Sequence, residues 1–517
     1  MKYLYSQLDK DNFSWFAQDM SVASLTEIDL RRGSLRGLNG FQIKITYPIS
    51  VIAGKNRSGK STILAMACCA FHNRKEGFKL PERRLTYYSF SDFFLQTSEE
   101  VPLEGIAIFY RIMHNNWKKS KYAPDGSGNL FQSRVKRRGG KWNNYDRRVK
   151  RNVVFLGVQR VVPHSEKSIS TSYRTYFSDQ APAGWETEVK EVVGRILGAS
   201  YDSFWMKTYG RYHLPLVANR GNIYSGFNMG AGENALFEIF SIIHATPKGT
   251  LLVIDEIELG LHEAAQKKLI KELKEVCRER HIQVICTTHS AAIIEAVPPE
   301  ARFYIENFSG KTSITPGISS AYAAGKLSGE KSNELDIYVE DGKAETIVEP
   351  FLSNDVRKRV SIIPIGSPIT IIRHMAGRYK EKRKAECICV MDGDQAAKIR
   401  HHMKKFLEAL ENSKDTEKEI EWFEQRLVFL PGKTWPEKWL IQTLRSIDLS
   451  ELAEILRISK EELSSYIEDA TSAKKHDEIY ILAKSLSLNH QHACSTICQW
   501  LSRVKNEEFA LIDQKIR

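Results

Sequence analysis

The chain has 517 residues, of which 42% are hydrophobic and 27% charged, and its formal net charge is +12. At about 100 to 200 residues per domain it is too long for one hydrophobic core, so we expect several domains. No stretch approaches the ~18 consecutive apolar residues of a membrane helix, and the N-terminus turns polar at Asp9 without the apolar segment of an export signal. We therefore expect no membrane association, and eight cysteines scattered over a long chain favour reduced thiols in the cytoplasm.

Two series of strands and helices follow one another along the chain. In the first, buried strands are predicted at residues 49–53, 105–111, 153–156, 251–254 and 283–286, with a helix at 262–280. A polar stretch at 309–333 is expected to be a linker. The second series has strands at 337–340, 360–364 and 387–391, and from residue 439 the pattern is helical, with a Ser-x-x-Glu start at Ser459. These patterns predict an α/β protein with parallel sheets and a helical C-terminal segment.

A glycine-rich segment, GKNRSGKS at residues 54–61, lies between a predicted strand and a predicted helix. It fits the phosphate-binding pattern G-x-x-x-x-G-K-[ST]. Backbone N–H groups of such a loop point at phosphate oxygens, the lysine reaches the β- and γ-phosphates, and the serine holds Mg²⁺. We expect ATP or GTP to bind here, with ATP favoured. The candidate ligands are Gly54, Asn56, Gly59, Lys60, Ser61 and Thr62.

A basic segment carries almost all of the net charge. From Arg111 to Arg151 there are thirteen Lys and Arg residues against two Asp residues, which gives +11. Aromatic residues such as Trp117, Tyr122 and Phe131 are interleaved with them, so the segment can neutralise phosphates and stack on bases. We expect it to contact nucleic acid. The alternative is a solvated loop, because several glycines break any regular structure there.

Two carboxylates follow the apolar strand at 251–254. Asp255 is expected to hold Mg²⁺ through water, and Glu256 to orient and deprotonate the water that attacks the γ-phosphate. Downstream of a phosphate loop, this pattern is typical of a Walker B motif.

The order of the motifs resembles that of an ABC-type ATPase. MGAGE at 229–233, with Gly230, Gly232 and Glu233, is similar to the ABC signature, and TTHS at 287–290 is similar to the segment of the switch histidine, here His289. Gln96 is the candidate for the Q-loop glutamine. The resemblance implies that two heads sandwich two nucleotides, so a homodimer or higher homo-oligomer is expected. Gly230 stands where many signatures have serine, which implies slow hydrolysis.

Acids also follow two strands of the second series. Glu340 comes at the end of the strand at 337–340, and Asp392 and Asp394 follow the strand at 387–391. Because the carboxyl ends of adjacent parallel strands face one crevice, these groups can converge on Mg²⁺ or Mn²⁺. An isolated Asp-Gly-Asp is otherwise a turn. The paired motifs resemble the Toprim domain, which implies phosphodiester cleavage by metals that activate water. The same resemblance adds three further candidates, the metal ligands Glu345 and Glu437 and the catalytic Lys433.

ELGLH at 258–262 is similar to a stretch of the OLD (overcoming lysogenization defect) family, in which an ABC-type ATPase is fused to a Toprim domain. The resemblance, shared with related Gabija and retron effectors, implies an ATPase domain at 1–325 with insertions at 111–245, a Toprim domain at 333–440 and a helical extension at 441–517. It implies an ATP-controlled endonuclease of antiphage defence that cuts DNA, with an operon-encoded reverse transcriptase or helicase as a candidate partner. The alternatives are cleavage of RNA such as tRNA, and an ATP-switched DNA-binding scaffold whose partner cuts.

Overall fold

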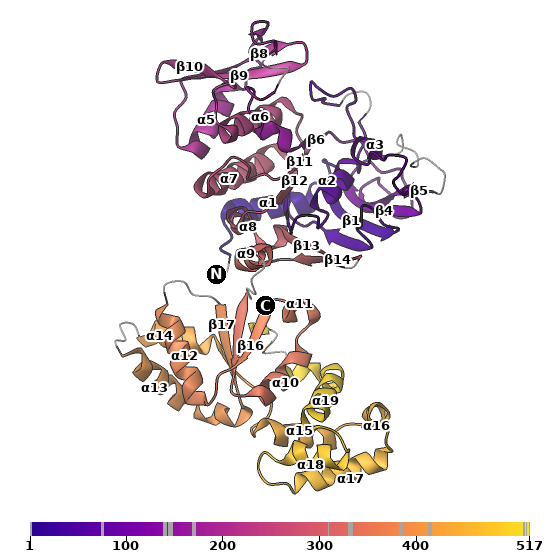
Figure 1. The fold of residues 1–517 in the computed structure, drawn as a ribbon, viewed down its shortest axis with the longest axis vertical. Helices are drawn as coiled ribbons and strands as arrows, with labels where there is room; N and C mark the ends of the chain where they lie inside the picture. Colours follow the sequence, from indigo (N-terminus) through magenta and orange to yellow (C-terminus); the bar gives the residue numbers. More distant parts are fainter. Residues whose placement is uncertain are drawn as a thin grey trace. The chain divides into compact units, whose positions relative to one another are not determined.

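The computed structural model describes the chain except residues 1–2, 74–76, 138–141, 143–147, 168–171, 309, 329–333, 382–385, 412–415, 510–511, 513 and 516–517. The chain forms two compact units, residues 2–332 and 333–517, which we call the N-terminal and C-terminal units. Both contain helices and sheets (Figure 1). Of the helices in the described ranges, none combines the length and the apolar character needed to cross a bilayer.

A six-stranded sheet forms the centre of the N-terminal unit, in the order β14-β13-β3-β12-β11-β6. Its strands are parallel except β14, which pairs antiparallel with β13 at one edge. The strands β3, β11 and β12 are buried at every residue, which is why their sequences are rich in apolar residues and do not alternate between apolar and polar ones. The strands are β3 (Ile49–Ala53), β6 (Val153–Leu156), β11 (Leu251–Ile254), β12 (Gln283–Thr288), β13 (Arg302–Phe308) and β14 (Lys311–Pro316).

The linker expected at 309–333 is wrong in the part that the structure describes. Lys311–Pro316 form the edge strand β14, and Ser320–Ser328 form helix α9. Tyr322 of α9 is fully buried, and its ring packs edge-on against Tyr304 of β13. An edge strand that is mostly only partly buried needs few apolar residues, so its polar sequence resembles that of a linker.

Two antiparallel sheets accompany the central one. The first, in the order β2-β1-β4-β5, contains β1 (Ser24–Arg32), β2 (Phe41–Lys44), β4 (Ile106–His114) and β5 (Gly128–Lys136). The second, in the order β10-β9-β8-β7, contains β7 (Ser178–Asp179), β8 (Ser203–Tyr209), β9 (Tyr212–Asn219) and β10 (Asn222–Ser225). Together with α5 (Glu186–Leu197) we call this second sheet the β7–β10 lobe. The other helical segments are α1 (Gln7–Gln18), α2 (Lys60–Cys68), α3 (Phe90–Phe93), η2 (Val158–Val161), α6 (Ala231–Ala245), α7 (Glu263–Arg280), α8 (Ala291–Ala296) and η3 (Pro299–Ala301).

The C-terminal unit is built on a parallel four-stranded sheet in the order β16-β15-β17-β18. Alternate residues of its strands enter different hydrophobic cores: Val339 lies on one face and Tyr338 on the other, so both faces of the sheet are covered. The strands are β15 (Leu335–Val339), β16 (Val360–Pro364), β17 (Glu386–Met391) and β18 (Leu427–Phe429). The helical segments are α10 (Gly342–Phe351), α11 (Asn354–Arg357), α12 (Pro368–Lys380), η4 (Gly393–Lys398), α13 (Ile399–Leu410) and α14 (Thr416–Glu424).

Helices follow one another from residue 436 to residue 509. They are α15 (Pro436–Arg445), α16 (Ser450–Leu456), α17 (Lys460–Thr471), α18 (Glu478–Ser485), α19 (His490–Val504) and η5 (Asn506–Phe509). The start predicted at Ser459 is confirmed, because Ser459 caps α17 in a reciprocal capping box with Glu462. Phe351 of α10 stacks on Phe509, and side chains of α15–α19 share one core with a face of the sheet. The C-terminal helices therefore fold as part of the same unit.

Candidate functional site

The phosphate loop connects β3 to α2. Gly54 follows the last residue of β3 and α2 begins at Lys60, so the free N–H groups of the first helical turn face the loop. Gly59 has a φ of 99°, and a Cβ there would lie 2.4 Å from a methyl group of Leu38, so only glycine fits. Lys60 Nζ donates to the carbonyl oxygens of Gly54 (2.8 Å) and Lys55 (3.1 Å), which holds its ammonium group across the loop.

The two predicted Walker B acids follow β11, which is separated from β3 by β12 in the sheet. Ser61 Oγ donates to Asp255 Oδ2 (3.1 Å), which brings the two expected Mg²⁺ ligands together. Thr287, at the end of β12, donates to Asp255 Oδ1 (2.5 Å) and accepts from the Glu256 N–H (2.8 Å). The pKa of Lys60 is lowered, because burial disfavours its charged form more than the nearby carboxylates of Glu256 and then Asp255 favour it. One ammonium group and two carboxylates therefore lie close together at this edge of the sheet. Of the other predicted ligands, Asn56 is exposed in the loop and Thr62 is buried in α2.

Glu258 fixes the segment that carries the switch histidine. Its carboxylate accepts hydrogen bonds from Thr288 Oγ1 (2.7 Å) and from the backbone N–H of His289 (2.6 Å). His289 therefore follows β12 at the same sheet edge as Asp255, which follows the neighbouring β11. Sequence reasoning noted Glu258 only as part of a family motif and missed this contact.

The predicted signature lies at the start of α6. The helix begins at Ala231, and Gly232 packs so closely against Gly260 that a Cβ on it would lie 2.1 Å from the Gly260 carbonyl oxygen. Glu233, a predicted nucleotide ligand, instead accepts hydrogen bonds from the hydroxyls of Tyr201 (2.6 Å) and Tyr224 (2.8 Å) of the β7–β10 lobe. Gly232 of the predicted signature therefore contacts the segment that follows the Walker B strand, and Glu233 contacts the β7–β10 lobe.

Replacing Gly232 by alanine is expected to destabilise the N-terminal unit by roughly 1–3 kcal/mol, because the new methyl group meets backbone that must move. Gly230→Ala is the matched control: a Cβ added to Gly230 would have no atom within 4 Å, and the φ of this residue is −61°. Thermal unfolding of the two variants measures the difference. Equal Tm values would contradict the close approach of α6 to Gly260.

The predicted Q-loop residue forms hydrogen bonds within its own loop. Gln96 is exposed after α3, where its amide donates to the Val101 carbonyl (2.7 Å) and accepts from the Leu103 N–H (3.3 Å). Gln159 is better placed. It is exposed in η2 directly after β6, which pairs parallel with β11, so it follows a strand at the edge that carries Asp255.

Arg160 is a second residue that the sequence did not single out. It is buried, with 2% of its surface exposed, and its guanidinium donates to the carbonyl oxygens of Gly157 (2.9 Å), Asp255 (2.7 Å) and Glu256 (2.6 Å). Glu256 has a φ of 47°, an unusual left-handed conformation for a non-glycine residue. The carbonyl oxygen of Arg160 in turn accepts from Asn234 of α6 (3.2 Å). Arg160 therefore connects the signature helix to the Walker B acids.

Replacing Arg160 by methionine is expected to lower kcat for ATP hydrolysis at least about tenfold while the Kd for ATP stays near the wild-type value. The side chain contacts no predicted nucleotide ligand except through the Asp255 and Glu256 backbone, so it acts as a positioning residue. Steady-state kinetics and a nucleotide-binding titration on the folded fraction separate the two quantities. Arg220→Met, at an exposed position, serves as the control; a parallel loss of kcat and binding would argue for simple misfolding.

In the C-terminal unit, two predicted acids lie side by side. Glu340 follows β15 and Asp392 follows β17, and these strands pair with Val339 opposite Val390. Glu340 Oε1 accepts the backbone N–H of Asp392 (3.0 Å), and Asp392 Oδ1 is buried without a hydrogen-bond partner among the described residues. Burial, followed by the neighbouring carboxylate of Glu340, raises the pKa of Asp392 to about 8, and burial also raises the pKa of Glu340. The pair is an electrostatically unfavourable arrangement that a cation would relieve.

The loop after β17 rests on the segment that precedes α15. A Cβ on Gly393 would lie 2.5 Å from the Gly432 carbonyl oxygen, so only glycine allows this approach. Lys433, next in the chain, is exposed beside it. Asp394 accepts a hydrogen bond from Gln395 (2.9 Å), and its carboxylate raises the pKa of Asp392 as a weaker cause than burial.

The remaining predicted ligands are placed differently. Glu437 is buried, and its two oxygens contact Lys343 Nζ and His476 Nδ1. Glu345 lies in the first turn of α10, and the preceding Asp341, which lengthens the motif by one residue, caps this helix by accepting from the N–H groups of residues 343 and 344. Within the described ranges, no group of three or more His, Cys, Asp or Glu residues is close enough to hold a metal ion as it stands.

The basic segment is partly structural. Arg134, Arg148 and Arg151 are buried, and each donates to backbone carbonyl oxygens of the N-terminal unit. Lys118, Lys119 and Lys121 are exposed in the β4–β5 connection together with Tyr122. The predictions that fall on Arg138, Lys141 and Arg147 lie outside the described residues. Within the described residues, the exposed basic side chains of the segment are the three lysines of the β4–β5 connection together with Arg137 and Lys150.

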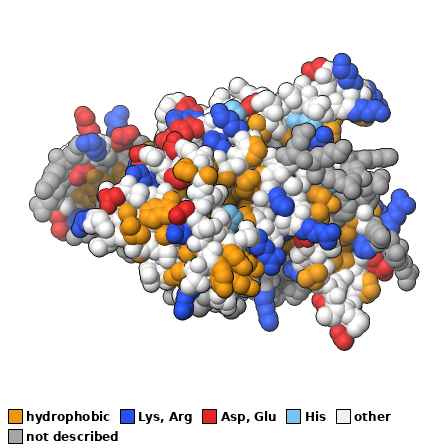
Figure 2. Space-filling model, turned by 90° about the horizontal axis from the view of Figure 1, so that it is seen from above, with side chains coloured by type: hydrophobic (Ala, Val, Ile, Leu, Met, Phe, Trp, Pro, Cys, Tyr) orange, Lys and Arg blue, Asp and Glu red, His pale blue; other side chains and the backbone are white. Residues whose placement is uncertain are grey.

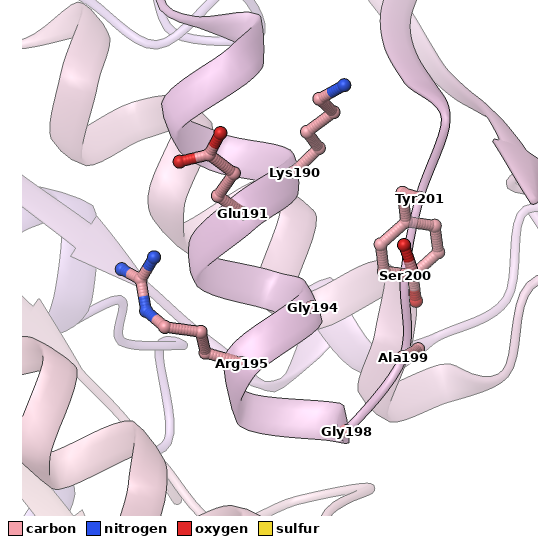
Figure 3. A pocket seen from close by; sticks show the side chains of 8 residues that line it. All are labelled: Lys190, Glu191, Gly194, Arg195, Gly198, Ala199, Ser200 and Tyr201. Atoms are coloured by element: carbon pink, nitrogen blue, oxygen red, sulfur yellow. The ribbon is translucent and has the colours of Figure 1, made fainter.

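A pocket of about 360 Å³ lies away from the phosphate loop, at the end of α5 in the β7–β10 lobe (Figure 3). Its charged lining is already engaged: Lys190 donates to the Asp202 carbonyl oxygen (2.7 Å) and Arg195 pairs with Glu272 (2.8 Å). Tyr201, which also lines it, is the residue that holds Glu233. We assign no ligand to this pocket.

Comparison with known proteins bears on the N-terminal unit. A family model described as "AAA domain, putative AbiEii toxin, Type IV TA system" matches residues 216–295, which run from β9 into α8. No curated protein matches the chain. Similar solved structures include an SMC head bound to the C-terminal winged-helix domain of ScpA, which is 14% identical, with 56% of this chain and 97% of that one covered and a TM-score of 0.37.

Two further SMC heads are similar at the same level. The SMC head domain from Thermotoga maritima is 14% identical, with 56% and 98% coverage and a TM-score of 0.31. The Smc head with an extended coiled coil bound to the C-terminal domain of ScpA, derived from Pyrococcus furiosus, is 12% identical, with 56% and 96% coverage and a TM-score of 0.36.

The family match contains the predicted signature, the Walker B strand and His289. The phosphate loop, Asp255 and His289 follow neighbouring parallel strands, which is the arrangement expected of an ATPase domain, and the family match to an AAA domain covers two of these three segments. The family match includes no residue of the C-terminal unit.

Proposed function

We propose that the protein is an endonuclease of the OLD type, in which the C-terminal unit is a Toprim domain that cuts nucleic acid with a divalent cation and the ATPase domain controls it. The observation that carries the proposal is the pair Glu340 and Asp392, side by side after adjacent parallel strands, with a buried Asp392 oxygen that has no partner in the described ranges. A carboxylate oxygen in this state is a ligand for a hard cation.

The donors of the pair fit Mg²⁺ or Mn²⁺, because all of them are carboxylate oxygens. Glu340 and Asp392 would hold the cation, with Asp394 as the next acid in the same loop and Glu345 and Glu437 as outer candidates. The bound cation would lower the pKa of a water and neutralise charge on the phosphodiester. Lys433, exposed next to Gly432, which approaches the Asp392 loop, would donate to a phosphate oxygen.

The ATPase domain would bind ATP with Mg²⁺ held by Ser61 and Asp255, and Glu256 would activate the attacking water. Because ABC-type heads close on two nucleotides, we propose a homodimer or higher homo-oligomer in the cytoplasm. Gly230 stands where many signatures have serine, so backbone N–H groups would make the γ-phosphate contact, and we expect slow turnover.

DNA is the proposed substrate, and the exposed lysines of the β4–β5 connection are its proposed contact. The description of the matching family, a putative toxin of a type IV toxin–antitoxin system, is compatible with a defence role. Cleavage of RNA such as tRNA is the second candidate, since a metal site built from carboxylates does not itself distinguish the sugars. A reverse transcriptase or helicase is a proposed partner class.

A cleavage assay tests the proposal directly. Plasmid DNA and tRNA are incubated with the full-length protein in Mg²⁺ or Mn²⁺, with and without ATP, and with EDTA as the metal-free control. We expect cation-dependent nicking of the plasmid whose rate changes with ATP. Cleavage of tRNA alone would favour the RNA alternative. No cleavage under any condition, with ATP-dependent DNA binding intact, would replace the nuclease by an ATP-switched scaffold.

A further inference from the structure

Four tyrosines gather at the turn between β8 and β9. Tyr209 and Tyr212 flank this turn, and Tyr173 and Tyr176 come from the segment before β7. The ring centroid of Tyr173 lies 4.8 Å from that of Tyr209 and 6.4 Å from that of Tyr212, and Tyr176 lies 5.5 Å from Tyr209. We call these four residues the tyrosine cluster.

The cluster is on the surface, not in a core. Tyr173 is 37% exposed and Tyr176 62% exposed, and Tyr209 and Tyr212 are half-buried. Figure 2 looks onto the end of the N-terminal unit that carries β8–β10 and shows hydrophobic side chains exposed beside Lys and Arg. Exposed aromatic rings in contact with one another offer a surface for a binding partner.

The charge around the tyrosine cluster is positive. Arg174 lies beside it in the chain, and Arg211 lies over the Tyr212 ring at 5.4 Å and donates to its hydroxyl (3.2 Å). Lys207 is paired with Asp179 at 3.5 Å, but neither Arg174 nor Arg211 forms an ion pair with any described residue. One guanidinium over an aromatic ring and a second arginine next to Tyr173 in the chain, neither ion-paired with a described residue, favour an anionic partner that also has flat rings.

The same lobe is connected to the predicted ATP signature. Tyr201, just before β8, and Tyr224 of β10 both donate to Glu233 of α6. The tyrosine cluster lies at the β8–β9 turn, so β8 and the strands it pairs with run from the cluster to the residues that hold the signature. A ligand at the cluster could therefore bias the position of α6.

We propose that the tyrosine cluster, with Arg174 and Arg211, binds a single-stranded segment of nucleic acid. Bases stack on the exposed tyrosine faces, and the two arginines contact phosphates. A duplex would not present its base faces to the cluster, so single strands bind more tightly. The choice of nucleic acid over a protein as the partner rests on the proposed function. The arrangement of the tyrosine rings and arginines is observed whether or not that function is correct.

Binding is measured by fluorescence anisotropy with a labelled oligothymidylate of about 15 nucleotides, in EDTA so that no cleavage occurs. The double variant Tyr173→Ser, Tyr176→Ser is expected to bind at least about tenfold more weakly, since stacking contributes about 1–3 kcal/mol per base. The variant Arg174→Ala, Arg211→Ala is expected to reduce the salt dependence of the affinity. Tyr480→Ser, at a tyrosine of α18 that is 58% exposed, is the matched control.

The proposal is overturned if both double variants bind the oligonucleotide with wild-type affinity. It is also overturned if the wild-type protein does not bind the oligonucleotide, and in either case the cluster is left as a contact for a protein. Equal loss in the Tyr480→Ser control would overturn the proposal as well. Fluorescence anisotropy measures binding and does not depend on cleavage. If the protein binds the oligonucleotide through the cluster but never cuts DNA, that result contradicts the proposed nuclease activity and leaves this inference intact.

Discussion

Glu256→Gln is expected to stop ATP turnover while leaving ATP binding intact. Glu256 follows Asp255 at the end of β11, and its backbone is held on both sides, with its N–H bound by Thr287 and its carbonyl oxygen by Arg160. Glutamine keeps the size of the side chain but cannot accept a proton. Loss of a general base costs about 10²–10⁴-fold in rate, so we expect kcat to fall by about 100-fold or more.

Phosphate release and nucleotide binding are measured on the same preparation. Lys60→Ala is the contrasting variant, because its ammonium group spans the phosphate loop and its removal should weaken ATP binding itself. If the heads close on two nucleotides as in other ABC-type ATPases, Glu256→Gln should also accumulate as an ATP-bound dimer in size-exclusion chromatography. Hydrolysis at the wild-type rate would remove Glu256 from the mechanism and leave Asp255 and His289 as the remaining candidates.

The sequence predicted the ATPase motifs well because each is local. A glycine loop between a strand and a helix, or acids directly after an apolar run, can be recognised from neighbouring residues alone. Gln159 and Arg160 were missed because their importance depends on the pairing of β6 with β11, which no local pattern reveals. Gln96 was predicted to be the Q-loop residue only from its position in the chain, and its side chain is hydrogen-bonded to Val101 in its own loop.

The charge count had a similar limit. Thirteen basic residues between positions 111 and 151 suggested one exposed surface, but Arg134, Arg148 and Arg151 are buried and donate to carbonyl oxygens. The guanidinium group of arginine has five N–H donors and can form hydrogen bonds with several main-chain segments at once. Composition alone does not distinguish this structural role from contact with a phosphate.

In the C-terminal unit, the alternation of strands and helices predicted that the acids after β15 and β17 would be neighbours, and they are. What the sequence could not predict is the contact of Glu437 with Lys343 and His476, which depends on how the C-terminal helices pack on α10. This contact sets Glu437 apart from Asp392, whose buried oxygen has no partner among the residues that the structure describes.

Asp392→Asn is expected to abolish cation-dependent cleavage, with a loss of about 100-fold or more, if the proposed nuclease is correct. Asparagine keeps the shape of the side chain and its backbone contact with Glu340, but it removes the negative charge that a divalent cation needs. The same change relieves repulsion, because burial and the carboxylates of Glu340 and Asp341 disfavour the ionised form of Asp392. We therefore expect the Tm in EDTA to be equal to or higher than that of the wild type.

The two measurements together separate loss of function from loss of structure. A variant that is at least as stable in EDTA, yet gains less Tm on addition of Mn²⁺ than the wild type, has lost a cation site and not its fold. Asp448→Asn, at an exposed carboxylate whose partners are Lys460 and Ser450, is the matched control and should change neither cleavage nor the Mn²⁺ effect. Cleavage by Asp392→Asn at the wild-type rate would show that the acids after β15 and β17 are not the catalytic centre, whatever else the C-terminal unit does.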